Sequence, residues 1–83
     1  MDDKEIEVNG KTFEKIYLEN VIKMCEKCFS NLDIFRMNFC NFFWFYGLKE
    51  ENCNKLIKHL DEMKDILLEY YSDLNKTREE NNG

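Results

Sequence analysis

The sequence has 83 residues, with 12 basic and 17 acidic side chains, one histidine and a formal net charge of −5. This length favours one domain, predicted over 1–74. A chain of this size buries only about 60% of its unfolded surface, so we expect one modest core and little room for an elaborate active site. The negative charge argues against non-specific binding to nucleic acid phosphates or anionic lipid.

Amino-acid usage indicates an AT-rich genome. Phe, Tyr, Met, Ile, Asn and Lys account for 41 residues, whereas Gly, Ala, Arg and Pro account for only 5. Low-GC bacteria, their phages and some parasites have such genomes. Residues 1–7 are acidic, unlike a signal peptide, and the longest apolar run, 42–46, is too short to cross a bilayer. We therefore expect a cytoplasmic protein whose cysteines are thiols.

The N-terminal segment has the alternating pattern of a half-buried strand. Ile6 and Val8 alternate with Glu5 and Glu7, and Asn9-Gly10 follows them. Because both turn residues tolerate positive φ, the segment predicts a small β-hairpin over about 4–13. A loose arm ending at Gly10 remains an alternative, since an isolated two-stranded hairpin is marginally stable.

A helical apolar period begins at residue 14. It predicts a first helix over about 14–29, ended by the turn-forming pair Ser30-Asn31. Asp33 is a suitable N-cap for a second helix over about 33–46, with Gly47 at the C′ position. A strand over Phe35–Tyr46 is the alternative, because apolar and polar residues alternate at its start.

The second predicted helix is apolar on two sides. One arc of about 100° is expected to face the core, and it holds Leu32, Phe35, Phe39, Phe42, Phe43 and Tyr46. Met37, Trp44 and Phe45 project elsewhere and form a candidate aromatic patch. This patch is either buried on a second side of a central helix or exposed as a partner-binding site.

The third predicted helix covers about 49–74 and has the most regular pattern. Its apolar residues are spaced alternately by three and four, at Cys53, Leu56, Leu60, Met63, Leu67, Tyr70 and Leu74. Such a seam can pair with a second copy of itself, so a homodimer through this helix is one expectation. Residues 75–83 lack apolar groups and predict a flexible polar tail. The fold class is therefore mainly α, a three-helix domain with a small hairpin.

The sequence contains no recognisable catalytic arrangement. Cys25, Cys28, Cys40 and Cys53 could supply four zinc ligands, but Cys40 and Cys53 lie 13 residues apart and the first pair falls within a helical stripe. Small buried apolar groups are the favoured interpretation of these cysteines. His59, the only histidine, has no evident nucleophile partner. We expect no enzyme and no cofactor.

An acidic stripe marks the third helix. Glu62, Asp65, Glu69 and Asp73 fall within about 80° of one side. Glu69 and Asp73 also lie toward the helix C-terminus, where the macrodipole disfavours negative charge. The stripe is either an ordinary solvated face or a surface that meets a basic partner.

These features favour a small acidic protein–protein interaction module. The most concrete hypothesis is an inhibitor of the phage or mobile-element type, similar in size and charge to anti-CRISPR and other anti-defence proteins. It would bind a host protein and block a basic nucleic-acid-binding surface, without contacting nucleic acid or membrane itself. The alternatives are a helical self-assembly or scaffold module and a small zinc-stabilised regulator.

Overall fold

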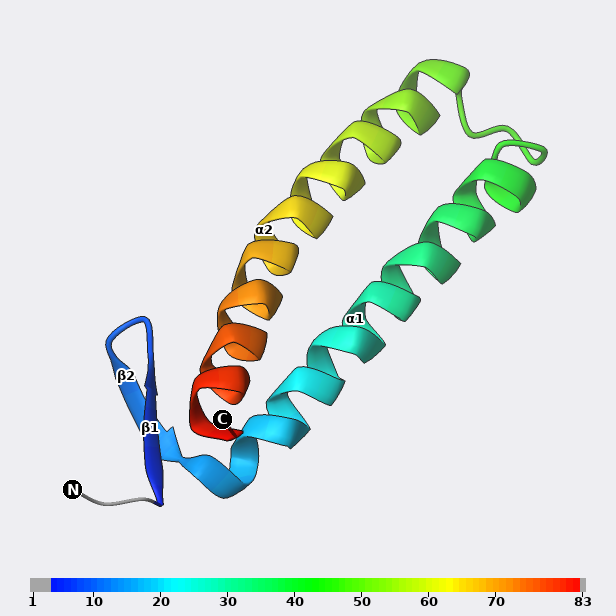
Figure 1. Ribbon diagram of the computed structural model, residues 1–83. Helices are drawn as coiled ribbons and strands as arrows, with labels where there is room; N and C mark the ends of the chain where they lie inside the picture. The colour runs from blue at the N-terminus through cyan, green and yellow to red at the C-terminus, as the bar shows by residue number, and fades with distance from the viewer. Residues whose placement is uncertain (1–3, 83) are drawn as a thin grey trace.

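Two long antiparallel helices form the body of the protein in the computed structural model, which describes residues 4–82 (Figure 1). The elements are β1 (Glu5–Val8), β2 (Lys11–Glu14), a 3₁₀ turn (Lys15–Tyr17), α1 (Leu18–Asn38), a π-helical turn (Phe39–Phe43) and α2 (Glu50–Asn82). The molecule measures 58 × 19 × 17 Å. The mainly helical fold and the N-terminal hairpin are confirmed, but the prediction of three helices is wrong.

Most of the first predicted helix and the first part of the second form one continuous helix, α1, which begins at Leu18 instead of residue 14 and passes at Phe39 into the π-helical turn. Ser30 and Asn31 are exposed helical residues, and Asp33 accepts a hydrogen bond from Lys64 Nζ at 3.0 Å instead of capping a helix. No glycine or proline lies between Gly10 and Gly47 to interrupt the helix. Turn-forming side chains on a solvent-facing side are tolerated inside a helix when the apolar residues before and after them face the same partner. Phe35–Asn38 is likewise helical, not a strand.

The prediction that Gly47 occupies the C′ position is confirmed. Gly47 has φ 106°, its N–H donates to the carbonyl of Trp44 at 3.3 Å, and the next N–H, of Leu48, donates to the carbonyl of Phe43 at 2.9 Å. This pair of bonds is the Schellman arrangement. It ends the widened π-helical turn and lets the chain reverse into α2.

The end of the third helix was predicted wrongly. The helix α2 continues past residue 74 to Asn82, so the part of the predicted polar tail that the structure describes is helical. This extension contacts the segment that leads into α1: Arg78 Nη1 lies 3.4 Å from Glu19, and Lys15 Nζ donates to the backbone carbonyl of Asn81 at 3.3 Å. Residues 1–3 and Gly83, which belong to the predicted domain and tail, lie outside the described residues.

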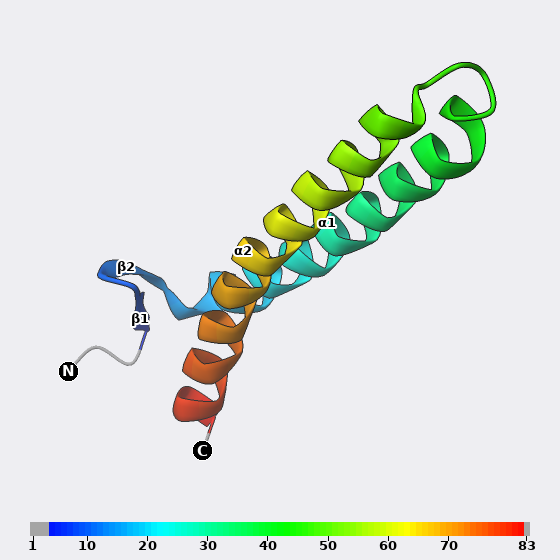
Figure 2. The same ribbon diagram turned by 90° about the horizontal axis from the view of Figure 1, so that it is seen from above.

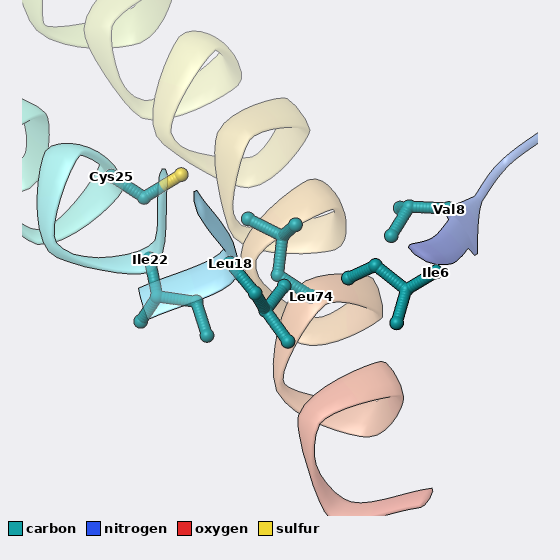
Figure 3. Close-up of a cluster of buried hydrophobic side chains, with 6 residues drawn as sticks. All are labelled: Ile6, Val8, Leu18, Ile22, Cys25 and Leu74. Carbon is teal, nitrogen blue, oxygen red and sulfur yellow. The ribbon is translucent and has the colours of Figure 1, made fainter. Parts of the chain in front are cut away.

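The β-hairpin packs against the open end of the helical pair. Asn9 and Gly10 both have positive φ, and the antiparallel register pairs Ile6 with Phe13 and Val8 with Lys11. Figure 3 shows Leu74 of α2 lying between Leu18 of α1 and Ile6 of β1. This packing explains why a hairpin that would be marginal alone is ordered here.

The core consists of two clusters along the helical pair. The cluster at the hairpin end contains Ile6, Val8, Leu18, Ile22, Cys25 and Leu74. The second cluster lies toward the other end of the pair and contains Phe39, Cys53 and Leu60. We call the end at which the two helices are connected, residues 39–53, the tip. Because the body is only one helix pair thick (Figure 2), each helix has just one neighbour to cover its apolar residues. Much of the apolar surface therefore remains exposed.

Candidate interaction surfaces

One side of the helical pair is crossed by polar contacts. Lys64 Nζ is 3.0 Å from Asp33 Oδ1, and Arg36 Nη1 is 3.3 Å from Asp61 Oδ1. The Tyr71 hydroxyl donates to Glu26 Oε2 at 2.7 Å, and this hydrogen bond to a carboxylate raises the pKa of Tyr71. These contacts fix the register between α1 and α2 on this side. Each exposed pair adds little stability individually.

The other side of the pair is apolar and uncovered. Helical projection places on it Cys28, Asn31 and Phe35 of α1 and Met63, Ile66 and Tyr70 of α2. All six are exposed, with Met63 at 55% and Ile66 at 71%. We call these six residues the open apolar face. A groove of about 610 Å³ runs along it between the helices, with Leu32 and Leu67 beneath.

The heptad pattern of α2 explains this face. One row, at intervals of seven, points at α1: Cys53, Leu60 and Leu74 are buried and Leu67 is half-buried. The other row, Leu56, Met63 and Tyr70, lies toward the open side, where only Leu56 is half-buried. A single partner helix covers one row of a two-row seam.

Most of the aromatic residues predicted to face the core are exposed instead. Phe39 is fully buried and Leu32 is half-buried, as predicted. The other four predicted core residues are exposed: Phe35, Phe42, Phe43 and Tyr46. The prediction assumed a third helix that would cover them, and the structure has none among the described residues.

The acidic stripe lies along the outer side of α2. Glu62 Oε2 is 3.5 Å from His59 Nδ1, and Asp73 accepts a hydrogen bond from Asn9 of the β-turn at 3.0 Å. Asp65 and Glu69 are exposed and make no hydrogen bond or ion pair within residues 4–82. By contrast, Asp33 and Asp61 on the polar side each meet a cation from the facing helix.

The predicted aromatic patch is divided between two places. Trp44 and Phe45 belong to the tip, in the turn after the π-helical turn, and Phe45 is 74% exposed. Met37 is 58% exposed and projects from α1 about 170° away from the centre of the Cys28–Phe35 row. At the tip the ring of Tyr46 contacts those of Phe42 and Phe45. The tip therefore carries an exposed aromatic cluster, and Met37, which was predicted to belong to the same patch, lies outside it.

The four cysteines form two separate pairs. Cys25 and Cys28 lie on α1, about 18 Å of helix before Cys40. Cys40 Sγ is 4.0 Å from Cys53 Sγ across the helical pair. Burial raises the pKa of Cys25, and burial together with the Cys40 contact raises the pKa of Cys53. Within residues 4–82, no three histidine, cysteine or acidic side chains gather into a metal-binding group.

Sequence reasoning did not identify Cys28 and Ile66 as surface residues of one site. The available signal was the two-row seam on α2 together with the uncharged positions Met24, Cys28, Asn31 and Phe35, spaced at i, i+4, i+7 and i+11. That spacing marks a continuous stripe on one helix side. The stripe forms one continuous surface only if a single helix runs through residues 30 and 31, as α1 does.

Comparison with known proteins gives no relative: no family model, curated protein or solved structure matches this chain. Within the described residues, no helix has a stretch long and apolar enough to cross a membrane.

Proposed function

We propose that this chain acts by binding another protein, as an acidic helical interaction module that covers a basic, nucleic-acid-binding surface on its partner. The observation that carries this proposal is the pair Asp65 and Glu69, exposed without a cationic neighbour on a stripe that also holds Glu62 and Asp73. A stripe of one sign steers association with a basic surface and favours its correct orientation.

The tip supplies a second element of this proposal. Trp44 and Phe45 are exposed at the far end of the helical pair from the β-hairpin (Figure 1). Large aromatic side chains contribute much of the binding energy at protein interfaces. The stripe would direct the encounter, and the aromatic cluster would anchor the bound state. An inhibitor of the anti-CRISPR or anti-defence type is the most concrete form of this function.

Affinity capture with charge-reversed variants tests the proposal. The bait is the whole chain, and the lysates come from AT-rich bacteria, including strains that carry CRISPR effectors. Asp65→Lys/Glu69→Lys should lose partners that bind nucleic acid, because reversed charges repel a basic surface. Glu5→Lys/Glu7→Lys is the matched control, since it changes the net charge equally at exposed positions on β1.

Competition and salt provide the second readout. Added DNA or RNA should release the captured partner, and raising the salt from about 50 to about 500 mM should weaken capture, because exposed charges are screened. A partner that Asp65→Lys/Glu69→Lys retains at every salt concentration would show that the stripe is not the binding surface.

A further inference from the structure

The open apolar face has the properties of an interface between two copies of the chain. We propose that the protein forms a two-fold symmetric homodimer in which the open apolar faces of two helical pairs meet, giving a four-helix bundle. This inference goes beyond the proposed function and does not depend on it.

The accessible surface is larger than that of a compact monomer of the same mass. A globular protein of 10.1 kDa exposes about 5,300 Å², whereas this chain exposes 6703 Å². The excess of about 1,400 Å² exceeds the roughly 800 Å² that each partner contributes to a standard interface. The radius of gyration, 17.3 Å, is likewise well above the about 12 Å of a compact chain of this length. A second copy offers enough surface to cover the excess.

The distribution of charge favours a second copy over a charged partner. None of the six residues of the open apolar face is acidic or basic, although 35% of the residues are charged; His59 and Glu62, which contact each other, lie at its edge on α2. Two molecules of net charge −5 can meet there without placing like charges in contact. The centre of the acidic stripe lies about 100° around α2 from the Met63–Tyr70 row, so Asp65 and Glu69 would remain on the outside of the bundle, whereas Asp73 and Glu62 lie closer to Ile66. A basic or acidic partner would find no complementary group on this face.

The packing pattern also fits self-association. Met63 and Tyr70 form the exposed part of a heptad row that begins at the half-buried Leu56, and such rows pack into the grooves of similar helices. The groove beside Met63 is bordered by both helices of the pair. In a two-fold interface each copy presents the same patch, so the row of one copy can enter the groove of the other and the reverse.

The test compares two methionines of nearly equal exposure. Met63 lies on the open apolar face and is 55% exposed, whereas Met37 projects from the opposite side of α1 and is 58% exposed. The Met63→Glu and Met37→Glu variants therefore carry the same substitution and differ in position. Both charges are solvated in the monomer, and circular dichroism at 222 nm verifies that each variant is helical. Ile66→Glu, at a 71% exposed position, provides a second variant on the face.

Sedimentation equilibrium in reducing buffer, over about 1–200 µM protein, is the measurement. The wild type and Met37→Glu should reach twice the monomer mass of 10.1 kDa. Met63→Glu and Ile66→Glu should raise the dimer dissociation constant at least about 100-fold, because each dimer would bury two unpaired carboxylates. Alkylation of Cys28 should be slower in the dimer than in Met63→Glu.

Three results would overturn the proposal. The first is a wild-type chain that remains monomeric at the highest concentration, which would leave the face for a different protein. The second is a dimer that persists in both Met63→Glu and Ile66→Glu, which would place the interface elsewhere. The third is a dimer that Met37→Glu disrupts as strongly as Met63→Glu does, which would remove the link to the open apolar face.

Discussion

Leu74 joins three elements of the fold, and its truncation gives a quantitative test of the architecture. It is fully buried and packs with Ile6 and Val8 of β1 and with Leu18 and Ile22 of α1 (Figure 3). Leu74→Ala removes the transfer free energy of a buried side chain and leaves a cavity, together about 3 kcal/mol. A chain of 83 residues has a total stability of about 4–12 kcal/mol, so the loss is a large fraction.

Urea unfolding followed by circular dichroism measures this loss. We expect a decrease of about 3 kcal/mol in the free energy of unfolding, or a melting temperature lower by roughly 12–24 °C. All samples share one protein concentration, because association would make the midpoint concentration-dependent. Leu68→Ala is the control: Leu68 is 53% exposed on the same helix, so it should lose less than about 1 kcal/mol. Equal losses in the two variants would refute the packing of the end of α2 against β1.

Three further predictions concern the tip and the polar side. Gly47→Ala should lower the free energy of unfolding by about 1–2 kcal/mol in urea titrations, because φ at this position is 106°; an unchanged midpoint would contradict the Schellman turn. Oxidised glutathione should join Cys40 to Cys53, whose sulfurs are 4.0 Å apart, and peptide mapping should find this bridge together with a higher urea midpoint. The hydrogen bond to Glu26 raises the folded-state pKa of Tyr71. The stability linked to this contact is therefore present below pH about 10 and is lost as the pH rises through the folded-state pKa. The Tyr71→Phe variant should lose less stability at alkaline pH than the wild type in unfolding experiments across pH, and identical profiles for the two proteins would exclude the contact.

The sequence predicted those elements whose signals are local. Asn9-Gly10 tolerates positive φ at two successive residues, and together with the alternation of Ile6 and Val8 this predicted the hairpin, with a loose arm as the alternative. Gly47 similarly indicates where the helix before it ends. In both cases a backbone conformation that few residues adopt marks the position of a turn in the sequence, although the order of the hairpin also depends on its packing against Leu18 and Leu74.

The boundaries that depend on distant contacts could not be predicted in this way. Ser30-Asn31 has turn propensity, but the facing helix α2 covers both the residues before it and the residues after it. The segment after Leu74 has no apolar residue, yet Arg78 reaches Glu19 and Lys15 reaches the carbonyl of Asn81. Tertiary contacts commonly override local propensity of this size.

The surface of α2 divides into three parts that serve different contacts. The row containing Leu60 faces α1, the row containing Met63 lies on the open apolar face, and the stripe containing Asp65 and Glu69 faces outward. On α2, Met63 projects about 60° from Leu60, about 160° from Asp65 and about 120° from Glu69. The proposed dimer and the proposed acidic binding surface therefore do not compete for the same residues. Asp65→Lys/Glu69→Lys should therefore remain dimeric while losing the basic partner. Met63→Glu should become monomeric and bind that partner through one stripe, with loss of avidity only.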